Sequence, residues 1–293
     1  MSQEFCRINL PYRDGEQQHV LTVTTRADQP GGKEALGTLP VVDVDNGLFC
    51  STEAYAELIA TLARRGVAVV THNDPEGCHR LDDKAGRSDA VTRVAGQYHP
   101  VTKISYSQSA LSATVNGPGL VADGLVSAFA FVAPAGIVRD PGIPEGFEAV
   151  GLGVQRHALA MLAYEYRQMM RQVLAARAGF GAAYAFHVRG FHGALQYGAL
   201  VAEAHATFTG SIMPGVVDLG RMVTLGVFGG DRDSYFPGHP MQQTLVNAGF
   251  PDQDMTVYNG AHTSPLFVPQ LMGQIADFVV AVSPERQQLD PQH

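Results

Sequence analysis

The sequence predicts an α/β protein built on a mostly parallel β-sheet that helices cover on both faces. Short apolar runs alternate along the chain with stretches of helical periodicity. These runs do not alternate with polar residues, as expected for strands that are buried on both faces of a parallel sheet. Glycine accounts for 32 of the 293 residues, above the average share of roughly 7%. This excess fits many tight turns between strands and helices.

The first clear unit is a strand, a helix and a second strand. Residues 39–44 (LPVVDV) form a β-branched run that ends at the turn signal Asn46-Gly47. Residues 51–65 have apolar side chains at helical spacing, and Gly66 is placed to end that helix. Residues 67–71 (VAVVT) then predict another buried strand. A helix between two such strands predicts that the strands are parallel.

The same alternation continues along the chain, with one interruption. Further strands are predicted at 20–25, 101–104, 126–132, 222–228 and 255–258, and further helices from about 110, at 158–178, at 241–248 and at 268–281. The rest of residues 1–40 is expected to form strands and loops, and 72–98 to form loops with at most one short helix. Between 137 and 215 helical patterns follow one another without a strand. We therefore expect an α/β core of residues 1–136 and 216–293, with a helical cap, or lid, inserted at 137–215.

Charge and cysteine content narrow the class of protein. The chain has 20 Lys and Arg against 28 Asp and Glu, a formal charge of -8, and no basic cluster, so nucleic acids are not expected partners. Cys6, Cys50 and Cys78 are too few and too scattered for a disulfide framework, which favours a reducing compartment. No apolar stretch reaches the roughly 18 residues of a membrane span. The sequence therefore predicts a cytoplasmic protein without a membrane span, and a homodimer stays open.

Three residues capable of chemistry follow three predicted strands. Ser107, Asp233 and His262 each lie just past a strand, where open α/β sheets bind their ligands. Ser107 is the centre of Ser105-Tyr106-Ser107-Gln108-Ser109, between a strand and an expected helix. A sharp strand-to-helix turn needs small residues two positions either side of the nucleophile, because the strand and the helix nearly touch there. Serine is small enough to satisfy that requirement.

In this order the three residues resemble the α/β-hydrolase fold family, and the likeness covers about residues 18 to 282. Four stretches carry it: 40–49 (PVVDVDNGLF) resembles the strand and oxyanion loop, 105–109 the nucleophile elbow, 230–237 (GDRDSYFP) the acid-bearing turn and 260–262 (GAH) the loop of the base. The sequence departs from the family in two places. Ser105 and Ser109 replace the glycines of the elbow, and Asn46-Gly47 replaces the usual His-Gly. Asp43 and Asp45 are unusual neighbours of that loop and are expected to alter its electric field.

The resemblance implies a role for each residue. Ser107 would be the nucleophile, His262 its general base, and Asp233 the acid that fixes the tautomer of the imidazole. The backbone N–H groups of Leu48 and Gln108 would form the oxyanion hole. The residues expected to support these groups are Asn46, Gly47 and Tyr106. Neither a cofactor nor a metal ion is expected.

Several other residues are weaker candidates. Asp231 could replace Asp233 as the acid, although the spacing to Pro237 favours Asp233, and Asp140 is a more distant alternative. Cys50 lacks the context of a nucleophile and is expected to be a small buried residue. No metal-binding spacing is found among the histidines of the predicted cap. These are His157, His187, His192 and His205.

We therefore expect a serine hydrolase that forms an acyl-enzyme on Ser107 with a medium-sized, largely apolar ester, lactone or thioester. The aromatic and methionine-rich composition of 137–215 indicates a small apolar or aromatic substrate. Three alternatives stay open: acyl transfer or cyclisation through the same acyl-enzyme, lyase-type chemistry in which His262 acts as acid and base, and ligand binding without turnover. The irregular elbow is compatible with a specialised biosynthetic role.

Overall fold

The computed structural model describes residues 4–14, 17–47, 52–72, 81–138 and 210–283, together with isolated residues between 164 and 207. In these residues eight strands form one sheet. The strands are β1 (Phe5–Asp14), β2 (Gln17–Arg26), β3 (Val41–Asp45), β4 (Ala68–His72), β5 (Val101–Tyr106), β6 (Val126–Val132), β7 (Thr224–Gly230) and β8 (Met255–Tyr258).

The sheet runs in the order β1-β2-β4-β3-β5-β6-β7-β8. β1 pairs antiparallel with β2, and β2 pairs antiparallel with β4. All pairings from β4 to β8 are parallel. The prediction of a mostly parallel sheet is therefore confirmed.

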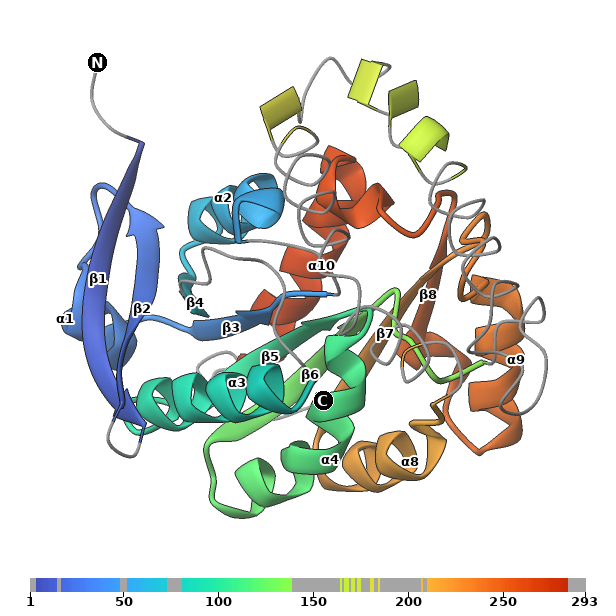
Figure 1. Cartoon of the computed structure of the whole chain (residues 1–293), viewed down its shortest axis with the longest axis horizontal. Helices are drawn as coiled ribbons and strands as arrows, with labels where there is room; N and C mark the ends of the chain where they lie inside the picture. The colour runs from blue at the N-terminus through green and yellow to red at the C-terminus, as the bar shows by residue number, and fades with distance from the viewer. Residues whose placement is uncertain are drawn as a thin grey trace.

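Helices cover both faces of this sheet (Figure 1). The described helices are α1 (Gly32–Thr38), α2 (Ala56–Arg64), α3 (Leu81–Gly96), α4 (Ser109–Ala122), α8 (Met213–Met222), α9 (Gly238–Asn247) and α10 (Pro269–Ala281), and the short 3-10 helices are η1 (Thr52–Tyr55), η3 (Asp252–Asp254) and η4 (Ser264–Leu266). One buried apolar cluster joins α2 and α10 to one face, and a second joins α1, α3, α4, α8 and α9 to the other. The expected covering of both faces is thus observed.

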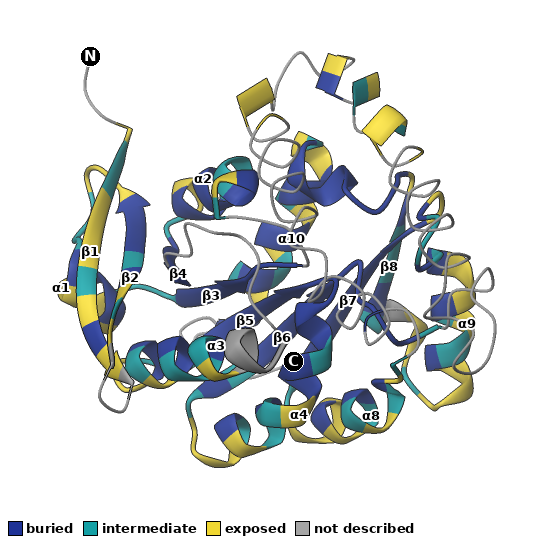
Figure 2. Cartoon of the chain, in the orientation of Figure 1, coloured by how far each residue is buried: buried dark blue, intermediate teal, exposed yellow. Residues whose placement is uncertain are grey.

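The central strands are buried along their whole length (Figure 2). Successive side chains of a strand point to opposite faces. In β3, Val42 and Val44 belong to the apolar cluster with α2 and α10. Asp43 and Asp45 therefore face the α3 side, where they too are fully buried. Two carboxyl groups thus enter the interior in a strand that is otherwise apolar.

The predicted strand, helix and strand near the N-terminus are confirmed. β3 and β4 are parallel neighbours, and α2 lies between them in the chain. Gly66 follows α2 with φ +84, a left-handed conformation that costs glycine little and ends helices. The strands predicted at 126–132 and 255–258 match β6 and β8.

The expectation of mainly loops at 72–98 was wrong, because α3 is a helix of 16 residues. Its inward face carries Ser88 and Thr92, which are buried against the acidic side chains of β3. A helix that buries polar residues against polar residues has no strong apolar period, so the pattern gave no signal. The helices α1 and α8 were also not predicted, and α1 begins within the turn-like pair Gly31-Gly32.

Most of the predicted cap, 137–215, lies outside the described residues. The residues described between 164 and 184 are helical, and Val173 is buried with the apolar cluster on the α2 and α10 face. Helix α8 begins at Met213 and packs against α4 of the core. The division into core and cap stays a prediction. Among the described helices none has the length and apolar character needed to cross a membrane.

Candidate active site

Ser107 occupies a sharp turn between β5 and α4. Its φ is +54, a left-handed conformation that non-glycine residues seldom adopt and that is found mainly where function requires it. Two backbone hydrogen bonds hold the turn: the N–H of Ser107 donates to the carbonyl of Val132 at 2.9 Å, and its own carbonyl accepts from Ala135 at 3.1 Å. This is the strained strand-to-helix turn that the sequence predicts for a nucleophile.

The serines that flank this turn are accommodated without loss of the geometry. Ser105 is fully buried in β5. The hydroxyl of Ser109 donates to the carbonyl of Tyr106 at 2.9 Å and lies 3.5 Å from the carbonyl oxygen of Asp45. Ser109 therefore adds a contact across the elbow that glycine could not make.

Ser107, His262 and Asp233 form one chain of hydrogen bonds. The imidazole Nε2 of His262 lies 2.9 Å from the hydroxyl of Ser107, and its Nδ1 lies 2.8 Å from Oδ2 of Asp233. All three residues are buried. Asp233 follows β7 and His262 follows β8, so neighbouring strands deliver the two groups to the edge of the sheet where β5 ends.

Asp233, and not Asp231, faces the imidazole. Oδ1 of Asp233 accepts hydrogen bonds from the backbone N–H groups of Tyr235 and Phe236, each at 2.9 Å, which leaves Oδ2 directed at His262. Oδ1 of Asp231 accepts instead from the N–H of Gly260 at 2.8 Å. The carboxyl group of Asp231 therefore joins the two loops.

The loops that carry Asp233 and His262 are in close contact. The backbone N–H of Arg232 donates to the carbonyl of Gly260 at 3.0 Å. A Cβ atom at Gly230 would collide with that same carbonyl. Only glycine fits at position 230, because any side chain would push Asp233 and His262 apart.

Three aromatic rings surround the imidazole of His262. The ring centroids of Tyr106, Tyr235 and Phe236 lie 5.6, 5.4 and 5.8 Å from that of His262. The Tyr106 hydroxyl also donates to the backbone carbonyl of His262 at 2.5 Å. Tyr106, which was predicted to be a supporting residue, thus contacts His262 directly. Tyr235 and Phe236 were not singled out, and nothing in the local pattern showed that they face the histidine.

The predicted oxyanion loop begins directly beside the elbow. A Cβ at Gly47 would lie 2.8 Å from Cδ1 of Tyr106 and 3.2 Å from Cβ of Ser107. The N–H of Gly47 donates to the hydroxyl of Tyr55 at 2.7 Å. Asn46 is buried, and its side-chain nitrogen lies 3.4 Å from the hydroxyl of Thr52.

The two predicted oxyanion donors differ in what the structure describes. Gln108 directly follows Ser107 and is the N-cap of α4, whereas Leu48 lies outside the described residues. Tyr55 was missed by the sequence reasoning. Its hydrogen bond with Gly47 depends on tertiary structure at the end of β3, and no local sequence motif predicts that bond.

A buried lysine accompanies the two acids of β3. The ammonium group of Lys103 lies 2.9 Å from Oδ2 of Asp43 and 2.9 Å from Oδ2 of Asp45. Burial raises the pKa of Asp43; the charge of Lys103 opposes this effect and that of Asp45 adds to it. Burial alone would lower the pKa of Lys103, but the two acids outweigh it and raise that pKa above its ordinary value. The sequence reasoning missed Lys103, which lies inside the buried strand β5.

Other candidate residues lie outside the described part of the chain. They are Asp140, Cys50 and the cap histidines His157, His187, His192 and His205. Within the described ranges no group of three or more His, Cys, Asp or Glu side chains is arranged to hold a metal ion.

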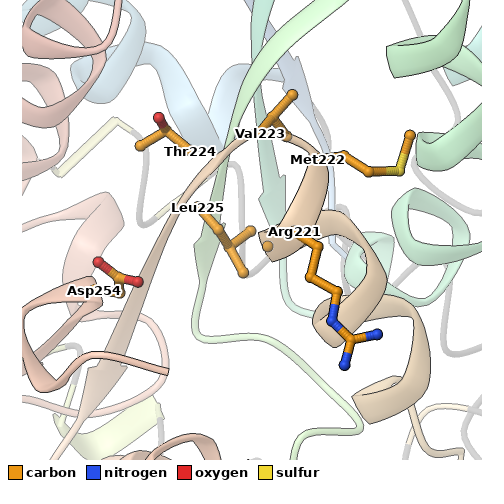
Figure 3. Close-up of a pocket in the computed structure, with 7 residues that line it drawn as sticks. Arg221, Met222, Val223, Thr224, Leu225 and Asp254 are labelled. Carbon is orange, nitrogen blue, oxygen red and sulfur yellow. The ribbon is translucent and has the colours of Figure 1, made fainter. Parts of the chain in front are cut away.

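A shallow pocket lies at the opposite edge of the sheet (Figure 3). Its lining includes Arg221, Thr224 and Asp254, around the start of β7. Asp233 follows the other end of β7, so this pocket is separate from the hydrogen-bonded chain of Ser107, His262 and Asp233. In the described part of the chain, no serine, cysteine or histidine side chain lines this pocket.

Comparison with known proteins shows similarity in structure but not in sequence. No protein-family model matches the chain, and no curated protein sequence matches it. A thioesterase domain from the curacin biosynthetic pathway superposes with a TM-score of 0.59 at 13% identity, over 94% of this chain and 99% of that chain. A thermophilic esterase from Thermogutta terrifontis gives a TM-score of 0.60 at 12% identity, over 95% and 99%.

A third solved structure agrees with these two. A hydrolase from Oleispira antarctica gives a TM-score of 0.57 at 15% identity, over 89% of this chain and 94% of that chain. The superpositions, the strand order and the strained turn at Ser107 all indicate the same fold. The chain has the α/β-hydrolase fold.

Proposed function

We propose that the protein is a serine hydrolase that forms an acyl-enzyme on Ser107. The observation that carries this proposal is the chain of hydrogen bonds from the Ser107 hydroxyl through His262 to Asp233. A serine hydroxyl is a weak nucleophile at neutral pH until a base takes its proton as the new bond forms. The matched structures with the same fold include a thioesterase and an esterase, which supports the proposal.

In the first step the oxygen of Ser107 attacks the carbonyl carbon of the substrate. His262 takes the hydroxyl proton on Nε2, and Asp233 stabilises the resulting imidazolium through Nδ1. The tetrahedral intermediate then collapses. The bond to the leaving group breaks, and His262 returns the proton to the departing oxygen or sulfur, so an alcohol or a thiol leaves.

The negative charge on the carbonyl oxygen needs fixed donors during this step. We assign that role to the backbone N–H groups of Gln108 and Leu48, by their positions after Ser107 and Gly47. Removing one donor of an oxyanion hole typically costs roughly 3 kcal/mol of transition-state stabilisation. Gly47 supports the loop because its own N–H is bonded to Tyr55.

In the second step water attacks the acyl carbon, and His262 takes a proton from that water. The bond between the acyl carbon and the Ser107 oxygen then breaks, His262 returns the proton to Ser107, and a carboxylic acid leaves. Another nucleophile in place of water would give acyl transfer or cyclisation from the same intermediate. The aromatic rings around His262 restrict the approach of bulk water to the base. The preference for a medium-sized, apolar ester, lactone or thioester stays a prediction from the composition of 137–215.

A fluorophosphonate probe tests the proposal directly, because it reacts with a serine only when a base activates that serine. We expect labelling of the native protein on the peptide that contains Ser107, identified by mass spectrometry. Ser107→Ala should abolish the labelling. Ser112→Ala is the matched control: Ser112 is a buried serine of α4 whose hydroxyl donates only within the helix, to the carbonyl of Ser109 at 2.9 Å.

Three results would overturn the proposal. Labelling that persists in Ser107→Ala would place the nucleophile elsewhere. A native protein that is folded but unlabelled, and that releases no thiol or alcohol from acyl thioesters and aryl esters, would favour ligand binding without turnover. If Ser107→Ala retained most of a measured activity, lyase-type chemistry centred on His262 would be favoured instead.

A further inference from the structure

The interior between β3, β5 and α3 contains a connected group of polar side chains. We call it the β3–β5 polar cluster, and it consists of Asp43, Asp45, Ser88, Thr92 and Lys103. Every member is buried, and the side chains of Lys103 and the two acids are no more than 2% exposed. Burying charges in this way is costly unless each is paired and hydrogen-bonded. A cluster that persists in the centre of the sheet therefore calls for an explanation beyond packing.

Asp45 is the most completely paired member of the cluster. Its Oδ2 lies 2.9 Å from the ammonium group of Lys103. The hydroxyl of Ser88 lies 2.7 Å from Oδ1 and 2.8 Å from Oδ2 of Asp45, and it accepts from Lys103 at 2.7 Å. The carboxylate of Asp45 is thus fixed by one residue of β5 and one residue of α3.

Asp43 has a different environment. Its Oδ2 lies 2.6 Å from the hydroxyl of Thr92, and among the described residues no group donates to its Oδ1. The Thr92 hydroxyl has a single hydrogen, yet the carbonyl of Ser88 also lies within 2.8 Å of it. If Asp43 holds a proton on Oδ2, it donates to Thr92, and Thr92 donates to Ser88. Asp43 is then neutral, so the ion pair is formed by Lys103 and Asp45 and the cluster has no net charge.

Asp45 is also the last residue of β3, directly before Asn46 and Gly47. In the parallel pairing of β3 with β5 it lies opposite Ser105, the first residue of the elbow pentapeptide. Its backbone carbonyl lies 3.5 Å from the hydroxyl of Ser109, the last residue of that pentapeptide. Asp45 therefore touches both sides of the junction between the nucleophile strand and the oxyanion loop.

We propose that Asp45 is a positioning residue: its buried bonds to Lys103 and Ser88 set the end of β3, and hence the oxyanion loop, relative to Ser107. The ion pair links β5, which leads into Ser107, to β3, which leads into the loop of Gly47. Asp43 and Thr92 lie one pleat further from the site and are bonded to each other. This proposal deepens the proposed function and rests on it for its kinetic consequences.

The two acids of β3 provide a matched pair of variants. Asp45→Asn and Asp43→Asn each replace a buried carboxyl group that lies 2.9 Å from the same lysine, in the same strand, two residues apart. A purely structural cluster would respond similarly to both changes. The proposal expects Asp45→Asn to lower kcat tenfold to a hundredfold, roughly the effect of a small misplacement of catalytic groups, with KM changed less than about twofold. Asp43→Asn should keep kcat within about twofold of the native value.

A second measurement reads the position of the loop without any turnover. The N–H of Gly47 is bonded to Tyr55, so its hydrogen exchange reports on whether the loop keeps its place. In Asp45→Asn this amide should exchange at least about tenfold faster, and in Asp43→Asn it should be unchanged. If the native protein proves to have no hydrolase activity, the proposed function fails while the exchange measurement still decides the role of Asp45.

A milder pair covers the case in which Asp45→Asn does not fold. Ser88→Ala removes the hydroxyl that is bonded to Asp45, and Thr92→Ala removes the one that is bonded to Asp43. Ser88→Ala should lower kcat and speed the exchange at Gly47, and Thr92→Ala should do neither. The proposal is overturned if both members of a pair change exchange equally, if exchange at Gly47 is unaffected, or if kcat of an active enzyme is unaffected.

Discussion

The backbone N–H of Gly47 donates a hydrogen bond to the hydroxyl of Tyr55, with 2.7 Å between nitrogen and oxygen. Gly47 follows β3, and Tyr55 ends the 3-10 helix that leads into α2. The ring of Tyr55 is fully buried and packs edge-to-face on Tyr106, with 5.5 Å between centroids. The loop proposed to hold the oxyanion is therefore anchored on the face of the sheet that α2 covers.

Tyr55→Phe tests this anchor. The change removes one buried hydroxyl and leaves the packing of the ring intact, and such a bond is worth about 1 kcal/mol. We expect kcat/KM for a thioester or ester substrate to fall about fivefold to tenfold, with the loss mainly in kcat. Tyr12→Phe, at a buried tyrosine of the edge strand β1, should leave kcat/KM unchanged. Equal kinetics in native protein and Tyr55→Phe would show that the anchor does not matter.

Asp233→Asn tests the choice of acid. The amide cannot hold the imidazole of His262 in the tautomer that accepts the serine proton, so kcat should fall by about four orders of magnitude. Asp231→Asn should cost less than about tenfold, because Asp231 contacts the N–H of Gly260 and not the imidazole. Steady-state kinetics and the rate of fluorophosphonate labelling check both variants. A larger loss in Asp231→Asn than in Asp233→Asn would reverse the assignment.

Gly47→Ala tests the close approach of the oxyanion loop to the elbow. The added Cβ would lie 2.8 Å from Cδ1 of Tyr106, and forcing a methyl group into such a contact typically costs about 1–3 kcal/mol of stability. We expect a lower free energy of unfolding together with slower labelling of Ser107. The control is Gly119→Ala in α4, where a Cβ meets nothing within 4 Å, so this change should stabilise the helix by about 0.5–1 kcal/mol. Urea denaturation measures both effects.

The raised pKa of Asp43 predicts a pH-dependent stability. In the unfolded chain this carboxyl titrates near its ordinary value of about 3.9, whereas burial keeps it protonated to higher pH in the folded protein. As the pH rises through this interval, the unfolded state loses the proton first, so the free energy of unfolding falls. Asp43→Asn lacks this titrating carboxyl group, so this contribution to the pH dependence is absent from the variant.

Urea denaturation of native protein and Asp43→Asn across pH 4 to 8 measures this effect. The stability of the variant relative to the native protein should increase with pH, by at most about 1.4 kcal/mol per pH unit, and level off above the folded pKa. The prediction concerns how the stability difference changes with pH and not its absolute size, because the variant also loses its contact with Lys103 at every pH. Parallel curves would show that Asp43 titrates normally in the folded protein.

Much of the fold could be predicted from local patterns. The runs at 126–132 and 255–258 became strands with the same bounds. For 126–132 the reason is burial on both faces, which leaves a nearly uninterrupted apolar signature. Helix α3 could not be predicted in this way. Ser88 and Thr92, which contact the two acids of β3, share its buried face with Val91 and Ala95. Hydrophobic periodicity is weak in a helix of that kind.

The candidate site shows the same difference between features that local patterns predict and features that depend on tertiary structure. Chain order and turn chemistry were enough to single out Ser107, Asp233 and His262, since each position depends on a local turn after a strand. The contacts of Tyr55, Tyr235 and Lys103 depend on strand register and on how loops fold back, and each partner lies on a different element. Sequence thus predicted the candidate reacting groups and the class of fold. Only the tertiary structure decided what holds those groups in place, because pairing between distant segments follows from packing and not from any local pattern.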